Sequence, residues 1–158
     1  MNRKKIVLVY PGQPATVIHR HIHIHLPLAL LQLGAWLQPR GYEVVIYDMR
    51  VQRFEEIDFS DSLAVGFSTM TNPQIRHALD TATRLRRDGH AMPFIWGGVH
   101  PSLFPEQCLA DPLVDFVVRR EGEETLTELL DLLARDEADF SAIRGLSYRD
   151  ATGAVRSN

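Results

Sequence analysis

Cysteine is nearly absent from this chain of 158 residues, which contains only Cys108. One cysteine cannot form a disulfide framework within the chain, hold an iron–sulfur cluster or build a zinc ribbon. The sequence therefore excludes those classes of site and is compatible with a reducing compartment. The simplest interpretation of Cys108 is a small, buried apolar residue.

A strong charge of one sign and long hydrophobic runs are also missing. The formal net charge is -3, with no basic surface for nucleic acid and no acidic tail. The apolar run at residues 6–10 is too short for the core of a signal peptide or for a membrane span. We therefore expect a cytoplasmic protein whose partners include neither nucleic acid nor a membrane.

The pattern of apolar runs alternates between strand and helix. Strands are expected at residues 6–10, 43–47, 63–67, 94–96 and 116–118, and helices at 27–38, 73–88, after Pro101 and at 124–134. This alternation predicts an α/β, flavodoxin-like fold with a five-stranded parallel sheet in the order 2-1-3-4-5 and helices on both faces. We expect one domain at residues 1–140, followed by a hairpin and linker at 141–158.

In such a sheet the ligand binds outside the carboxyl ends of the strands, which draws attention to three loops. The first places hydroxyls beside a helix start, in the residues Ser68, Thr69, Met70 and Thr71. Hydroxyls and helix amides suit a phosphate or a heterocyclic nitrogen, although helix capping alone would also explain them.

The other two loops contain glycine. One is Gly97-Gly98-Val99-His100, where paired glycines would let a ligand lie against bare backbone, or would simply make a tight turn. The other is Glu121-Gly122-Glu123, where the carboxylates could instead interact with a helix dipole. Each motif alone is weak, so their order along the chain matters more.

The spacing joins these loops into a recognisable set. Ser68-x-Met70 followed by twenty-six residues and Gly97-Gly98 resembles the Ser-x-Leu and Gly-Gly half of the cobalamin-binding fingerprint, with Met in place of Leu. The sequence at large resembles the cobalamin-binding N-terminal domain of radical S-adenosylmethionine enzymes across residues 4–150. The further segments that carry this resemblance are Pro27-Leu28-Ala29-Leu30, Asp48, Val99-His100-Pro101-Ser102, Pro105-Glu106, Asp115 and Glu121 to Leu126.

The resemblance implies how cobalamin would lie. Its nucleotide tail would be threaded into the sheet between the first and third strands, with Ser68 and Thr69 at the benzimidazole end. Gly97, Gly98, His100 and Gly122 would line the groove around the tail. The corrin ring would lie over the strand ends, against Tyr10, Pro11, Gly12 and Met49. The remaining expected cofactor contacts are Asp48, Met70, Thr71, Val99, Glu121 and Glu123.

The other half of the fingerprint, Asp-x-His-x-x-Gly, is missing. With residues 27–67 as the spacer, its His would fall on His23, but residue 21 is His and residue 26 is Leu. We therefore expect binding without an axial histidine and keep His23 as a possible cobalt ligand. The run from His19 to His25 could equally be a solvated loop, a corrin contact or an adventitious metal site.

The chain alone is expected to be non-catalytic, because radical S-adenosylmethionine chemistry needs a Cys-x-x-x-Cys-x-x-Cys motif that it lacks. The resemblance implies a parent enzyme, of the methyltransferase type, whose barrel domain would bind S-adenosylmethionine and a [4Fe-4S] cluster. The end at Asn158 would then be a domain boundary. A stand-alone cobalamin carrier or sensor is the alternative.

A flavin-binding or receiver-like protein of the same fold fits less well. The residues after the first strand, Pro11-Gly12-Gln13-Pro14, make a poor phosphate loop, and Ser68 stands where a receiver needs an Asp.

Overall fold

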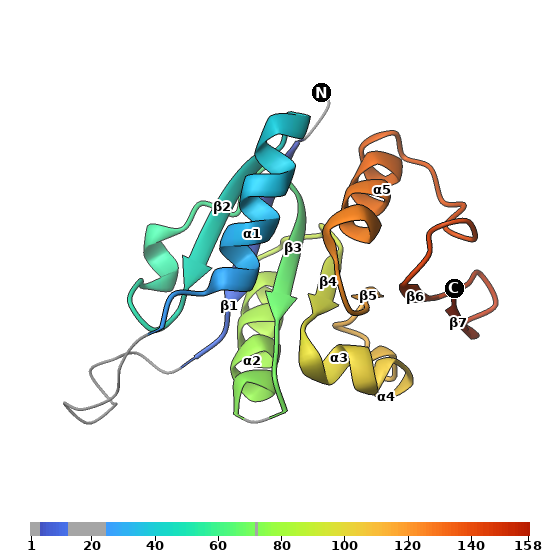
Figure 1. Ribbon diagram of the computed structural model, residues 1–158. Helices are drawn as coiled ribbons and strands as arrows, with labels where there is room; N and C mark the ends of the chain where they lie inside the picture. Colours follow the sequence, from blue (N-terminus) through green and yellow to red (C-terminus); the bar gives the residue numbers. More distant parts are fainter. Residues whose placement is uncertain (1–3, 13–24, 72) are drawn as a thin grey trace.

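The computed structural model describes residues 4–12, 25–71 and 73–158. Seven strands in these residues form one sheet in the order β2-β1-β3-β4-β5-β6-β7 (Figure 1). Strands β1 to β5 run parallel, and β6 and β7 are antiparallel to their neighbours. The strands are β1 Lys5–Tyr10, β2 Glu43–Asp48, β3 Ser62–Ser68, β4 Phe94–Gly97, β5 Phe116–Val118, β6 Leu146–Arg149 and β7 Val155–Ser157.

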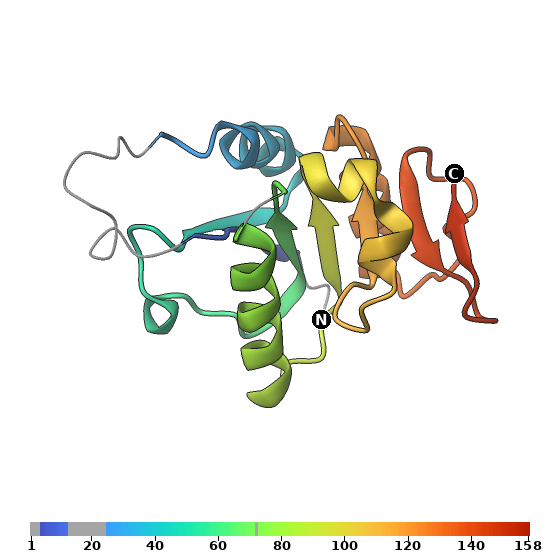
Figure 2. The ribbon, with the colours of Figure 1, turned by 90° about the horizontal axis from the view of Figure 1, so that it is seen from below.

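Helices cover both faces of the sheet, as predicted. The α-helices are α1 Leu28–Leu37, α2 Gln74–Arg87, α3 Val99–Leu103, α4 Pro105–Leu109 and α5 Glu123–Ala134, with 3-10 turns η1 Gln38–Arg40 and η2 Phe54–Glu56. Figure 2 shows α1 and α5 on one face and α2 on the other. No helix of the described residues is long and apolar enough to cross a membrane.

The central strands divide their side chains between two cores. In β1, Ile6 and Leu8 pack with α1 and α5, whereas Val7 and Val9 pack with α2 and α4. All four side chains are buried. This division follows from the alternation of side chains along a strand, and burial on both faces explains why β1 reads as one apolar run.

The expected count of five strands is wrong, although the order of the first five is confirmed. The C-terminal hairpin does form, but β6 pairs with β5, placing Tyr148 beside Phe116 and Leu146 beside Val118. The sheet gains these strands because β5 would otherwise be an uncovered edge. Leu146 and Tyr148 are buried in the core shared with α5, so the hairpin is part of the same sheet.

The Tyr148 ring lies 5.5 Å from that of Phe140, which lies 5.0 Å from Phe116. We expect Tyr148→Ala to lower the free energy of unfolding by about 3 kcal/mol, because it leaves a cavity under the edge of the sheet. Val155→Ala on the exposed strand β7 is the matched control and should change it by less than about 0.5 kcal/mol. Urea unfolding measures both values, and equal, small effects would mean that the hairpin adds nothing to the core.

Candidate functional site

A groove with a volume of about 160 Å³ lies between α1, α5 and the carboxyl ends of β3, β4 and β5. Its position on the α1 and α5 face matches the edge at which ligands bind in parallel sheets. The lining residues are Leu8, Ala29, Leu30, Gln32, Leu33, Gly66, Phe67, Ser68, Ile95, Gly97, Gly98, Val118, Arg120, Glu121, Gly122, Glu123 and Leu126.

Small residues make up the floor of the groove. Gly66 and Ser68 alternate along β3 and face α1 and α5, and Gly97 ends β4 beside them. A Cβ atom on Gly66 would lie 2.9 Å from Leu8 Cδ2, and one on Gly122 would lie 3.1 Å from Val118 Cγ1. At both positions a neighbouring side chain already takes the space that a Cβ would need, so the close packing at the floor requires glycine.

Two hydroxyls at the end of β3 differ in their surroundings. The Ser68 side chain is half-buried, lines the groove and makes no hydrogen bond within the described part of the chain. Its hydroxyl is therefore available to a ligand. Thr69 is fully buried outside the groove lining, and its Oγ1 also has no hydrogen-bond partner within the residues described.

The loops after β3 and β4 pack directly on each other. Gly98 has a φ of 98°, and a Cβ there would lie 2.6 Å from the Thr69 carbonyl oxygen. The Thr69 amide donates to the Gly97 carbonyl at 2.9 Å, and the His100 amide donates to the Thr69 carbonyl at 3.3 Å. Thr71 Oγ1 and His100 Nδ1 are hydrogen-bonded at 3.1 Å. These contacts hold the two loops at the groove in one arrangement.

Side-chain hydrogen bonds connect α1 and the turn after it to α5, beginning at the groove and continuing toward the amino end of the sheet. Gln32 Nε2 donates to Glu123 Oε1, and Trp36 Nε1 donates to Thr127 Oγ1 at 3.2 Å. The Tyr42 hydroxyl donates to Asp131. Burial, together with the hydrogen bond to Asp131, raises the pKa of Tyr42 well above its usual range. The three bonds set how far the two helices can separate.

A second cluster forms at the ends of β1 and β2. The Arg50 guanidinium donates to both carboxylate oxygens of Asp48, at 2.9 and 2.7 Å, and lies 4.2 Å from the centre of the Tyr10 ring. It also donates to the His25 carbonyl at 2.7 Å. The hydrogen bond to Asp48 raises the pKa of Arg50. A Cβ on Gly12 would lie 2.8 Å from Arg50 Cγ, so this loop also packs on the guanidinium arm.

Six of the sixteen predicted cofactor contacts line the groove: Ser68, Gly97, Gly98, Glu121, Gly122 and Glu123. Thr69, Thr71 and His100 take part in the packing of the loops, and Met70 and Val99 are each 51% exposed at the same end of the sheet. The residues at the Arg50 cluster, outside the groove, are Tyr10, Pro11, Gly12 and Asp48.

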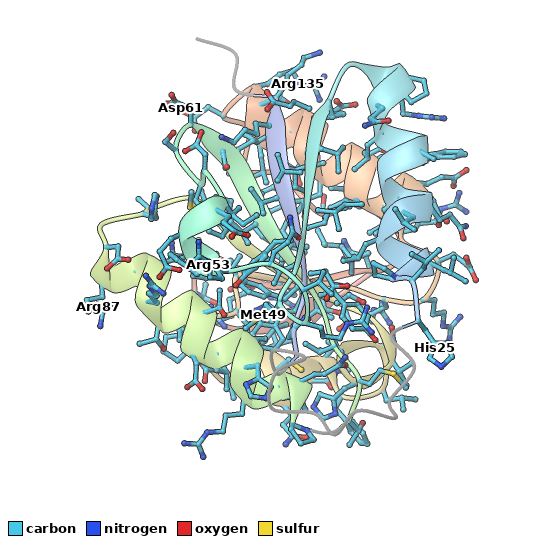
Figure 3. The ribbon with its side chains drawn as sticks, turned by 90° about the vertical axis from the view of Figure 1, so that its left-hand side faces the viewer. His25, Met49, Arg53, Asp61, Arg87 and Arg135 are labelled. Carbon is cyan, nitrogen blue, oxygen red and sulfur yellow. The ribbon has the colours of Figure 1, made fainter. Side chains whose placement is uncertain are left out.

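Met49 and the histidines are placed differently from the groove residues. Met49 packs toward α2, where it accepts a hydrogen bond from Thr81 Oγ1 at 3.6 Å. In Figure 3, His25 projects outward beside the start of α1. His23 lies outside the described residues, and no group of three His, Cys, Asp or Glu side chains within the described ranges could hold a metal ion.

Sequence reasoning missed Gly66 and the apolar walls of the groove. Gly66 interrupts an otherwise apolar strand, and an isolated glycine in a strand signals close approach of another group. The walls come from Leu8, Leu33 and Leu126, which have no such signal because a leucine that lines a groove resembles one in the core.

The B12 binding domain family matches residues 15–130, most of the chain. The chain belongs to this family. The predicted resemblance of the chain to cobalamin-binding domains is thereby confirmed. The structure fits this ligand, because the groove has a glycine-lined floor and a free Ser68 hydroxyl at its side.

Two curated relatives are methyltransferases. The B12-binding domain is 27% identical over 180 residues to the cytidylyl-2-hydroxyethylphosphonate methyltransferase of Streptomyces wedmorensis, covering 97% of this chain and 33% of the relative. It is 29% identical over 167 residues to an uncharacterized methyltransferase of Pyrococcus horikoshii, covering 99% of this chain and 35% of the relative. This chain therefore spans about a third of the length of these relatives.

Solved structures share the fold. The cobalamin-dependent S-adenosylmethionine radical enzyme OxsB, with aqua-cobalamin and S-adenosylmethionine bound, is 25% identical with a TM-score of 0.76, and the match covers 98% of this chain and 22% of that enzyme. The radical S-adenosylmethionine methyltransferase TsrM from Kitasatospora setae, with cobalamin and a [4Fe-4S] cluster bound, is 24% identical with a TM-score of 0.74. That match covers 99% of this chain and 29% of TsrM.

Gly98→Ala tests the packing of the two loops against a matched control. Gly89 also has a positive φ, 89°, but a Cβ there would meet nothing within 4 Å. Gly89→Ala should therefore cost only the backbone strain, about 1 kcal/mol, whereas Gly98→Ala adds a backbone clash and should cost at least about 2 kcal/mol more. Thermal and urea unfolding measure the difference, and equal costs would contradict the packing described.

Proposed function

We propose that this B12-binding domain holds cobalamin with its nucleotide tail in the groove between α1 and α5. The observation that carries the proposal is the groove at the carboxyl edge of the sheet, whose floor is made by the small residues Gly66, Ser68 and Gly97. In the rest of the same face, the strands bury large side chains such as Ile6 and Phe116. An open groove over a floor of small residues favours a bound ligand, because protein interiors are otherwise closely packed.

Different groove residues would make different contacts with the tail. Ser68 would hydrogen-bond a heterocyclic nitrogen of the tail, and Gly97, Gly98 and Gly122 would let the tail lie against backbone. The corrin ring would lie over the strand ends. Apolar side chains are exposed there on the loop after β3 and on α3, namely Met70 at 51%, Val99 at 51% and Leu103 at 63%.

The lower face of cobalt is proposed to have no axial histidine from this chain. The sequence has no Asp-x-His-x-x-Gly motif after β1, and His100 is buried in the packing of the two loops, where its Nδ1 is hydrogen-bonded to Thr71. His23 is kept as the alternative ligand, and His23→Ala distinguishes the two modes. The visible absorption bands of bound cobalamin should be the same in His23→Ala and the native chain, whereas shifted bands would identify His23 as a ligand.

The domain is further proposed to be the N-terminal part of a cytoplasmic radical S-adenosylmethionine methyltransferase. The Streptomyces wedmorensis methyltransferase and the radical S-adenosylmethionine methyltransferase TsrM are each about three times as long as this chain. The barrel would bind S-adenosylmethionine and the [4Fe-4S] cluster, and residues 141–158 would lead toward it. Cobalamin would supply the methyl-transfer chemistry, while this domain would bind and orient it. Nucleic acid and membranes are not proposed as partners.

Titration with hydroxocobalamin, followed by gel filtration, tests the binding proposal. We expect a corrin absorption spectrum to co-elute with the chain. Gly122→Leu should weaken binding by at least about tenfold, because its side chain would occupy the groove beside Val118 and Leu33. Gly122 has a φ of -97°, which any residue can adopt, so the variant should fold.

Ala151→Leu, in the exposed turn between β6 and β7, is the control and should bind like the native chain. Equal affinity in Gly122→Leu and the native chain would exclude this groove as the site. If neither this chain nor a longer one containing it retained cobalamin, the proposed function would be wrong.

A further inference from the structure

The Arg50 cluster lies across the carboxyl edge of the sheet from the groove. β1 has β2 on one side and β3 on the other, and the ligand crevice of a parallel sheet opens at such a switch point, beyond the ends of the strands. The groove lies over β3, β4 and β5, whereas Tyr10 and Asp48 of the cluster are paired at the ends of β1 and β2. The groove volume of about 160 Å³ is too small for a corrin ring, so the ring has to lie beyond it.

Arg50 ties three separate segments together in this cluster. Its guanidinium donates to both carboxylate oxygens of Asp48, at the end of β2. Its Nη2 also donates to the His25 carbonyl before α1, at 2.7 Å, and a Cβ on Gly12 after β1 would lie 2.8 Å from Arg50 Cγ. The side chains of Arg50 and Asp48 are 13% and 10% exposed. One shielded ion pair therefore contacts the described ends of the connection between β1 and α1.

This set of contacts needs arginine rather than lysine. A planar guanidinium carries its donors in a fixed fork, so it can bind a carboxylate with two hydrogen bonds and still reach a carbonyl. Its charge also lies 4.2 Å from the centre of the Tyr10 ring. An ammonium is a single point of charge and cannot make all of these contacts together. By contrast, the neighbouring Arg53 pairs with Glu56 within one exposed turn.

We propose that Arg50 is a positioning residue for the corrin ring, because it holds the chain at Gly12 and at His25 in the places that the ring requires. This inference rests on the proposed function and names a residue that prepares the same site. Without Arg50 these two ends take several positions, and the apparent affinity falls to the fraction of molecules in the native one. The groove keeps its shape, since Leu30 and Leu37 hold α1 in the core.

Absorbance titrations with cobalamin and with cobinamide, which has no nucleotide tail, test this role. Arg50→Lys should weaken the binding of both by at least about tenfold and by the same factor, because the ring is common to them. Arg53→Lys is the matched control and should bind both like the native chain. A loss for cobalamin alone would place the effect in the groove and overturn the proposal. If the native chain binds neither corrinoid, the proposed function and this inference fail together.

A second variant keeps the test independent of how well Arg50→Lys folds. Asp48→Asn removes the carboxylate charge that clamps the guanidinium and should give the same loss for both corrinoids. The double variant should lose no more than either single variant, because the two residues form one tie, whereas losses that multiply would contradict it. Thermal unfolding is measured in parallel. A lower unfolding temperature with native affinity for both corrinoids would mean that Arg50 only stabilises the fold, and would overturn the proposal.

Discussion

The alternation of small and large side chains on β3 is the constraint on which the rest of this domain depends. Val65 and Phe67 fill the core on the α2 face, while Gly66 and Ser68 put only small residues on the opposite face, under the groove. One strand can do both because successive side chains point to opposite faces. Large residues at 66 and 68 would fill the groove, so the hydrogen bonds between α1 and α5 and the packing of Gly98 on Thr69 would no longer frame a ligand site.

Much of the fold could be predicted because long apolar strands and amphipathic helices alternate in the sequence. The order of the first five strands and the loops at their carboxyl ends follow from that pattern. The place of the C-terminal hairpin could not be predicted, because short strands such as β6 do not indicate their partners. Only the structure shows that Tyr148 pairs with Phe116 and extends the sheet.

The glycines and hydroxyls of the candidate site were predicted from the sequence, whereas the apolar residues that form its walls were not. Gly97, Gly98 and Gly122 are conspicuous at strand and helix ends, whereas Leu8 and Leu126 come from a strand interior and a helix face. Tyr10 and Asp48 were expected as cofactor contacts, but their pairing with Arg50 was missed, because it depends on the turn geometry after β2. Those walls give the groove its apolar interior.

Amide hydrogen exchange with and without hydroxocobalamin tests most directly whether cobalamin occupies this groove. Exchange slows where a ligand covers the backbone or suppresses local opening. The account predicts that protection on binding is concentrated at residues 66–71, 97–100 and 119–126, with little change in α2 on the opposite face. Protection centred on α2, or on the Arg50 cluster without the groove, would contradict it.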